Sequence, residues 1–509
     1  MKKTKRILGV AGLMLATLSL ASCDFEEAFS DKPEADMSNV YFEDRYFQYD
    51  GEEKTMKIIG ELPEGVRVSY TNNVQKDKGT YEVTATFTSS DYKKIEPMTA
   101  TMSIIDLNVG SYPQSVVKDK TLHDNIIKYG TFNKTTGLMT YNGKEYEILR
   151  CNDSNFEKNS KDNSLLSDGT IMIKDEFYVF EIEPIKWQIL DKTDDGHYIL
   201  LAEDILDRCR YFFETNFEYQ SNSFEYTSDK YDDCFSYIIN QEYDPEIGQM
   251  IPIGREYYYD KNKYSDYSER TWEIEKNILL NATSRFGNPL AKADSDGFDF
   301  LSLAENNYEY SYVRKWLNDD FYNTAFNSND KAKILKTKVD NSCKSAFEYY
   351  PETYYDKDGN WIFFAPYTAN VTPSSNFWKQ ENSWNAWMSN DTQDYVYLPS
   401  ANDLINIHYG FDGLAKIEDD PSTPYIESTS VANTDKTRAC GISDYATCRG
   451  AKEHNPVNNK WYWDYLTRTP EHISNSKIYY VKGHNGQMFV GEQSYNTGIR
   501  PMITVKLDD

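Results

Sequence analysis

The chain has 509 residues, of which 39% are hydrophobic and 27% are charged, so it is long enough for about two to four domains with buried cores. It holds 54 Lys and Arg against 81 Asp and Glu, which gives a net charge of −27. Because nucleic-acid and anionic-membrane binding both need a basic surface, this balance argues against them, and we expect no nucleic-acid partner.

The first 22 residues are typical of a secretory signal. A cationic run, Met1-Lys2-Lys3-Thr4-Lys5-Arg6, precedes an apolar stretch over residues 7–20. That stretch is shorter than the ~20 residues that span a bilayer core, which favours a signal peptide over a membrane-spanning helix. The stretch ends in Leu20-Ala21-Ser22-Cys23, which resembles the lipobox of bacterial lipoproteins.

This resemblance implies that Cys23 becomes the first residue and carries a diacylglycerol thioether. The protein is then expected at the bacterial cell envelope, lipid-anchored and facing away from the cytoplasm. The alternative is an ordinary signal peptide with a chance cysteine. Residues 23–39 are acidic and poor in β-branched side chains, a composition typical of a flexible tether.

Residues 40–105 form a predicted β-module. Side chains alternate between apolar and polar over 66–70, 81–87 and 98–104, which predicts half-buried strands separated by turns. The residues Tyr49-Asp50-Gly51 and Leu62-Pro63-Glu64-Gly65, with 79–83, are similar to the bacterial surface repeats called MBG or YDG domains. The resemblance implies an all-β, Ig-like module of the kind that serves as a spacer or adhesive stalk.

Residues 106–509 are predicted to form one large mixed domain, which makes the whole chain α+β. Thr121, Ser311 and Ser400 are predicted to start helices, the last with Asp403 in the position usually held by Glu or Gln and with Gly410 as its stop. Strands are expected at 177–180, 187–190, 198–201, 477–481 and 503–507, and loops at 212–232 and 241–270. The predicted core contains Trp187, Leu190, Leu200, Trp316, Leu317, Leu398 and Ile503.

Six sequence blocks resemble an uncharacterised bacterial family, domain of unknown function 6273, over almost all of 106–507. The chain departs from the family at 308–310, where a Trp is usual, and at 463–470, where residues are inserted. The blocks are Gly110-Ser111-Tyr112-Pro113-Gln114, 183–190, 198–203, 311–318 with 321–322, Tyr397-Leu398-Pro399-Ser400 with Asp403, and Gly498-Ile499-Arg500-Pro501.

Two of these blocks, at 398–404 and 498–500, are similar to C-type-lectin-like domains of the formylglycine-generating type. The resemblance implies a base of helices and a closing strand, with ligands bound by the long loops. Arg500 and Arg314 are predicted structural clamps, because a guanidinium offers five donors in a planar fork. Contact of Arg500 with a ligand is the alternative.

Catalytic signatures are missing from the sequence: it contains no HExxH, GxSxG, Walker or GxGxxG motif, and its six His residues are scattered. No cofactor is expected. A stretch with Asp294, Asp296, Asp299 and Glu305 is similar to a calcium loop, but Phe298 and Asp299 replace the usual ligand and glycine. A solvated acidic loop is therefore predicted there, with calcium as the alternative.

Six cysteines follow Cys23, which allows three disulfides, and Cys440 and Cys448 are close enough in sequence to pair.

The best ligand candidates are Trp378, Trp384 and Trp387 with Asn385, because flat rings stack on sugars while amides bond hydroxyl groups. The alternative is that these rings are packed in the core.

We therefore expect a lipid-anchored surface protein that binds a glycan or a protein without catalysis. An enzyme derived from a formylglycine-generating fold and a structural envelope component are the alternatives. A membrane contact through the N-terminal lipid is expected in each case.

Overall fold

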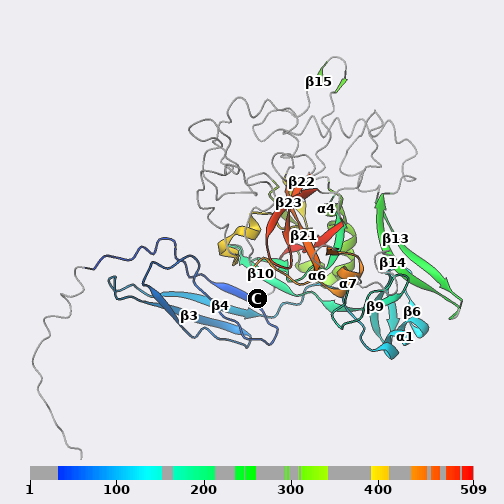
Figure 1. The fold of residues 1–509 in the computed structure, drawn as a ribbon, viewed down its shortest axis with the longest axis horizontal. Coiled ribbons are helices and arrows are strands. Elements are labelled where there is room, and N and C mark those ends of the chain that lie inside the picture. Colours follow the sequence, from blue (N-terminus) through cyan, green and yellow to red (C-terminus); the bar gives the residue numbers. More distant parts are fainter. Residues whose placement is uncertain are drawn as a thin grey trace, which may run out of the picture.

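The computed structural model describes residues 32–151, 164–211, 235–245, 247–259, 293–294, 297–298, 308, 311–341, 391–411, 437–455, 460–470, 477–492 and 496–507. These residues are mostly in β-strands with few helices (Figure 1). None of the helices in these ranges has the length and apolar character needed to cross a membrane.

The N-terminal module is built on a four-stranded sheet in the order β1-β4-β3-β2, in which β1 and β4 are parallel and the other pairs antiparallel. Val83, Ala85 and Phe87 of β3 are buried while their neighbours are more exposed, as the alternation predicted. They pack in a core that also holds Met56 and Met102. The strands are β1 (Arg45–Gln48), β2 (Arg67–Thr71), β3 (Gly79–Thr88) and β4 (Met98–Ile105).

A five-stranded sheet follows, in the order β5-β9-β8-β7-β6, with α1 on one face. Neighbouring residues of β8 and β9 are buried on both faces: Ile148 and Val179 pack beneath α1, while Leu149 and Phe180 join the main core. The elements are β5 (Ser111–Val116), α1 (Lys120–Tyr129), β6 (Thr131–Phe132), β7 (Met139–Tyr141), β8 (Lys144–Arg150) and β9 (Phe177–Pro184).

Two local predictions in this part of the chain are wrong. Helix α1 is capped by Asp119, whose carboxylate accepts from the N–H groups of Thr121 and Leu122, so the predicted cap at Thr121 lies two residues too late. The predicted loop at 241–270 contains strand residues, because β13 (Phe235–Asp244) and β14 (Gln249–Tyr259) pair as an antiparallel hairpin. Ile251 of that hairpin is buried beneath α1.

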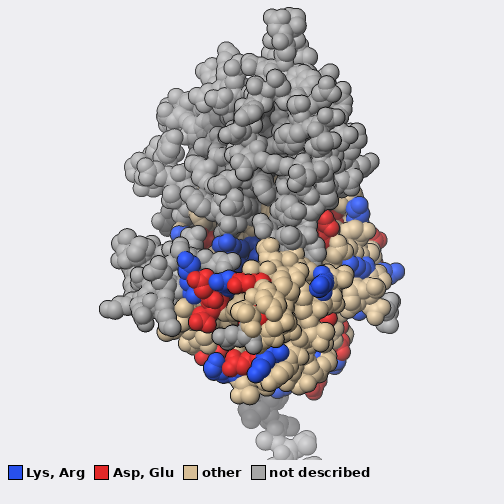
Figure 2. Space-filling view, turned by 90° about the vertical axis from the view of Figure 1, so that its right-hand side faces the viewer, with Lys and Arg blue, Asp and Glu red and all other residues tan. Residues whose placement is uncertain are grey.

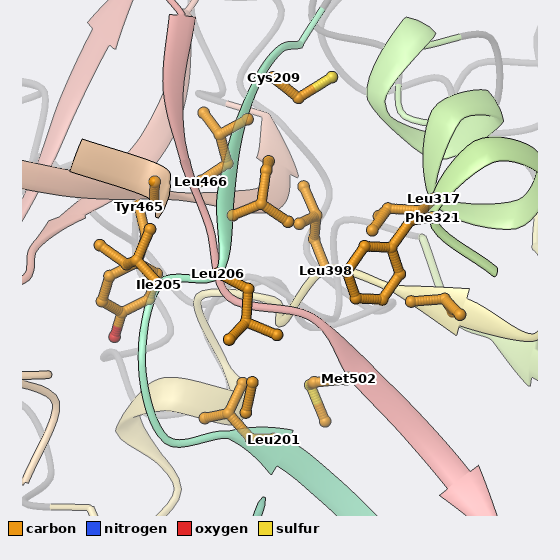
Figure 3. Close-up of a cluster of buried hydrophobic side chains, with 14 of the residues drawn as sticks. Leu201, Ile205, Leu206, Cys209, Leu317, Phe321, Leu398, Tyr465, Leu466 and Met502 are labelled. Carbon is orange, nitrogen blue, oxygen red and sulfur yellow. The ribbon is translucent and has the colours of Figure 1, made fainter. Parts of the chain in front are cut away.

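Two further sheets carry the main core. One has the order β10-β11-β25-β19, and the other has the order β12-β24-β21-β22-β23 with β20 paired to β21. Figure 3 shows Leu201, Leu206, Leu398, Leu466 and Met502 converging from segments far apart in the chain. The strands are β10 (Trp187–Lys192), β11 (Tyr198–Ala202), β12 (Asp207–Arg210), β19 (Val396–Tyr397), β20 (Lys452–Asn455), β21 (Lys460–Pro470), β22 (Lys477–Lys482), β23 (Met488–Glu492), β24 (Asn496–Ile499) and β25 (Met502–Val505).

All seven predicted core residues of this region are buried in that cluster, which confirms them. The helix predicted after Ser311 is also confirmed, since the Ser311 hydroxyl accepts from the N–H of Arg314, but it continues as a π-helical turn. The helical elements are α4 (Tyr312–Trp316), η4 (Leu317–Phe321), α5 (Tyr322–Ala325), α6 (Ser328–Lys333), η9 (Asp403–Ile405), η10 (Ile407–Tyr409) and α7 (Asp444–Cys448).

The segment after Ser400 forms two short 3-10 turns instead of the predicted helix, and Gly410 ends the second at a φ of 88°. Ser400 and Asp403 nevertheless make the two reciprocal bonds of a capping box: the Ser400 N–H donates to the Asp403 carboxylate, and the Asp403 N–H donates to the Ser400 hydroxyl. Asp403 thus does the work of the usual Glu or Gln.

The module packs directly against the large domain. Gln48 of β1 donates to the Leu107 carbonyl at 2.6 Å and accepts from the Trp187 N–H at 2.7 Å. Arg45 of the same strand donates to the His408 carbonyl, and the His408 ring lies 2.9 Å from the Glu43 carboxylate. The module is therefore hydrogen-bonded to the large domain along β1.

Candidate functional site

The predicted ligand residues lie in the sequence between two strands that pair with each other. Strand β17 (Thr337–Val339) runs antiparallel to β18 (Thr392–Asp394), with Val339 opposite Thr392. We call these two strands, with Asn341 and Arg314 beside them, the neck. In the sequence, residues 342–390 lie between the two strands of the neck.

A chain of buried polar contacts fixes the neck. Asn341 Nδ2 donates to Thr392 Oγ1 at 2.9 Å, and that hydroxyl donates to Asp394 Oδ2 at 2.5 Å. The Asp394 carboxylate has no exposed surface and meets Arg314 through Nε at 2.8 Å and Nη2 at 2.7 Å. This two-nitrogen contact neutralises Asp394 and joins the neck to helix α4.

A second guanidinium, Arg468 of β21, contacts the residue that follows β17. Its Nη1 donates to the Leu398 carbonyl at 2.6 Å and to Asp403 Oδ2 at 2.8 Å, and its Nε donates to the Asp340 carbonyl at 3.4 Å. Burial acts to lower the pKa of Arg468, but Asp403 acts to raise it, and the net shift is upward. Arg468 therefore stays charged while it ties β21 to the Leu-Pro-Ser turn.

Arg500 occupies a third buried position, just before β25. Its Nε donates to the Ala202 carbonyl at 2.7 Å, its Nη1 to the Tyr465 hydroxyl at 3.3 Å and its Nη2 to Gln188 Oε1 at 3.2 Å. All three partners belong to the protein, and together they connect the two central sheets. Gly498, two residues earlier, is required by space, because a Cβ there would lie 2.6 Å from the Asp464 carbonyl.

A fourth charged group lies where the five-stranded sheet meets α7. Asp207 accepts from Arg449 Nε at 3.1 Å and from the Tyr112 hydroxyl at 2.6 Å. Asp444, the first residue of α7, accepts from the backbone N–H of Val116 at 3.0 Å and from the Ser167 hydroxyl at 2.6 Å. These contacts anchor α7 firmly to its neighbours.

The chemistry of these four groups is that of anchors. Each guanidinium and carboxylate is buried or partly buried and bonded to protein groups, as a structural role requires. Within the described ranges no three His, Cys, Asp or Glu side chains lie close enough together to hold a metal ion. Figure 2 shows basic and acidic side chains intermingled on the described part of one face.

Several predicted site residues lie outside the described residues. These are Cys23, Trp378, Trp384, Trp387, Asn385, Asp296, Asp299 and Glu305. Asp294 lies in β15 (Ala293–Asp294), which pairs with β16 (Gly297–Phe298), but its side chain is not described. The two predicted clamps hold different parts of the fold. Arg314 holds β18 through Asp394, and Arg500 connects the two central sheets.

Asp394, Arg468 and Asp207 were not singled out from the sequence. A buried aspartate looks like a surface aspartate when its partner is distant in the chain, and Arg314 precedes Asp394 by 80 positions. The usable signal for Asp394 was its place in the alternating run Thr392–Tyr397, since every second residue of that run faces the core.

Comparison with known proteins places one part of the chain. Searches of curated proteins and of solved structures yield no match. One family model matches a region that contains the neck, α4, the Leu-Pro-Ser turn, α7 and strands β19 to β25. It does not include the predicted blocks at 110–114, 183–190 and 198–203. The C-terminal region of the chain, over residues 295–357 and 367–507, matches the family described as a domain of unknown function, DUF6273.

Proposed function

We propose that this protein is a lipid-anchored component of the bacterial cell envelope that binds a glycan or protein ligand on the extracytoplasmic side without catalysis. The observation that carries the location is the ordered run of cationic residues, short apolar stretch and lipobox that ends at Cys23. In this proposal, the acidic segment 23–39 holds the folded part away from the membrane.

The proposal for binding rests on residues 342–390, which join the aromatic and amide side chains suited to sugars to a rigid base. The neck holds both ends of this segment through Asp394 and Arg314, and Arg468 adds a bond to Asp340. A binding loop gains affinity when its ends are fixed in advance, because less conformational entropy is lost on binding. The sequence carries none of the common hydrolase, phosphate-binding or dinucleotide-binding motifs, which supports binding over catalysis in this proposal.

We also propose that residues 40–105 are an Ig-like module of the MBG or YDG type and that the large domain is C-type-lectin-like. The residues at 49–51, 62–65 and 79–83 support the first assignment, and those at 398–404 and 498–500 support the second. Strands β10 and β11, from the predicted blocks outside the matched region, pair with β25 and with one another. This pairing supports a single α+β domain that extends from 106 to 507.

Two experiments test the proposal separately. Metabolic labelling with a fatty-acid analogue should label the wild-type protein and not Cys23→Ala, and equal labelling of both would overturn the anchor. For binding, the full chain carrying Cys23→Ser is screened on a glycan array. Trp378→Ala, Trp384→Ala or Trp387→Ala should weaken a hit at least tenfold, whereas Trp461→Ala in β21 should not.

The same variants and treatments also distinguish the two alternative functions. Loss of a chemical activity after thiol alkylation or metal removal would favour an enzyme of the formylglycine-generating type. Retention of normal envelope binding after all three Trp replacements would instead favour a structural component. Equal losses of binding and melting temperature would assign the Trp residues to the core.

A further inference from the structure

Two thiols that are distant in the sequence meet in the interior. Cys151 directly follows β8, and Cys448 is the last residue of α7, about 300 positions later. The Cys448 and Cys151 thiols hydrogen-bond to each other, and both lie in the same buried cluster as Tyr178. Both are buried in the main core, with 0% and 7% of their surfaces exposed.

The surroundings hold each thiol in position. The backbone of Cys151 makes two hydrogen bonds to the turn before β9. Its N–H donates to the Glu176 carbonyl, and its carbonyl accepts from the Asp175 N–H. Helix α7 is capped by Ser443 and tied by Asp444 to the backbone at Val116 and Ser167. The two sulfur atoms therefore meet because of the fold and not because of chance side-chain motion.

Cys440, the partner that sequence spacing suggested for Cys448, is engaged elsewhere. Its N–H donates to the Gly483 carbonyl, and its own carbonyl accepts from Trp463 Nε1 at 3.0 Å, so it belongs to the sheet of β21 and β22. In the described part of the chain, Cys440 and Cys448 are not joined by a disulfide. The pairing that the sequence spacing allowed, Cys440 with Cys448, is therefore not the arrangement found.

We propose that Cys151 and Cys448 form a disulfide that links the five-stranded sheet to α7. In this step each thiol loses a proton, the pair gives up two electrons, and one S–S bond forms. The oxidant is a disulfide of another molecule, which is reduced to two thiols by way of a mixed disulfide with one of the cysteines. Disulfides persist in exported proteins, which agrees with the proposed location, but the pairing itself does not depend on that location.

The disulfide forms while the chain is folding. Exchange needs a thiolate, and burial raises the pKa of Cys448 well above its ordinary value, so the folded protein holds almost none. Before α7 packs against the sheet, both thiols are in water and ionise normally. The test must therefore start from the unfolded, reduced chain.

The full chain carrying Cys23→Ser is reduced, unfolded and refolded in a mixture of reduced and oxidised glutathione. Free thiols are blocked with iodoacetamide, and the folded fraction is digested without reductant for mass spectrometry. We expect a peptide that joins Cys151 to Cys448 in most molecules and that disappears on reduction. Cys440→Ala, a matched control in the same core, should retain this peptide.

Recovery of Cys448 in the folded fraction as an alkylated thiol, or joined to any cysteine other than Cys151, would overturn the proposal. A second measurement uses Cys151→Ala, in which Cys448 should be alkylated instead of linked elsewhere. If that variant does not fold, the wild-type peptide map decides the question alone.

Discussion

Asp394 and Arg314 form a buried ion pair in which a guanidinium nitrogen lies 2.7 Å from a carboxylate with no exposed surface. The pair joins helix α4 to β18, the strand that follows residues 342–390 in the sequence. Each partner has a further role: Asp394 accepts from Thr392, and Arg314 lies in the first turn after the Ser311 cap. Loss of the ion pair should therefore affect both the neck and helix α4.

Asp394→Asn is expected to lower the free energy of unfolding by about 2–4 kcal/mol, because it leaves the half-buried Arg314 guanidinium beside a neutral partner. Urea unfolding followed by fluorescence measures the change. The control is Glu96→Gln at the exposed pair with Lys94, where about 0–1 kcal/mol is expected. Similar effects at the two sites would show that the neck is not held by this pair.

Arg500→Lys is expected to destabilise the protein by about 2–4 kcal/mol although the charge is kept. A lysine cannot reach the Ala202 carbonyl, the Tyr465 hydroxyl and Gln188 together, so at least one buried group loses its partner. The matched control is Arg67→Lys on an exposed position of β2, which should leave the unfolding midpoint within error. A ligand-contacting Arg500 would instead lose affinity with no loss of stability.

The sequence predicted elements well where burial is one-sided. Strands β2, β3 and β4 appear within two residues of the alternating runs, and the Ser311 cap was read correctly from a local signal. The hairpin of β13 and β14 was missed because its Asp, Asn and Gly residues are typical of loops, although its Ile251 is buried in a hydrophobic core.

The polar anchors were less predictable than the strands, because long-range partners leave no local pattern. Arg500 could be identified as a clamp candidate from its motif, but its three acceptors come from β10, β11 and β21. The partner of Cys448 is a similar case: sequence spacing allowed a bond with the nearby Cys440, and the fold brings Cys151 close instead. Contacts of this kind depend on the order of strands in the sheets.

Gln48 is predicted to couple unfolding of the module to that of the large domain. Its amide bridges the Leu107 carbonyl and the Trp187 N–H, so Gln48→Ala leaves two backbone groups without partners, at a cost of about 1–3 kcal/mol. Calorimetry should show one transition for the wild type and two for the variant. Glu82→Gln on an exposed face of β3 should keep one transition. A single transition in Gln48→Ala would mean that other contacts along β1 suffice.

The last prediction concerns the pH dependence at Cys440. Burial raises the pKa of this thiol to about 12. Because only the thiolate reacts, its alkylation in the folded protein should rise about tenfold per pH unit from pH 8 to 10, whereas in the unfolded chain the rate should level off above about pH 8.5. The folded state keeps the proton that the unfolded state loses in this range, so stability falls as the pH rises above about 8.5. Cys440→Ala should make that fall less steep, and the unfolding midpoint at pH 8 and pH 10 measures it. Rapid alkylation of Cys440 at pH 8 in the folded protein would show that the thiol is open to solvent and contradict its place behind β21 and β22.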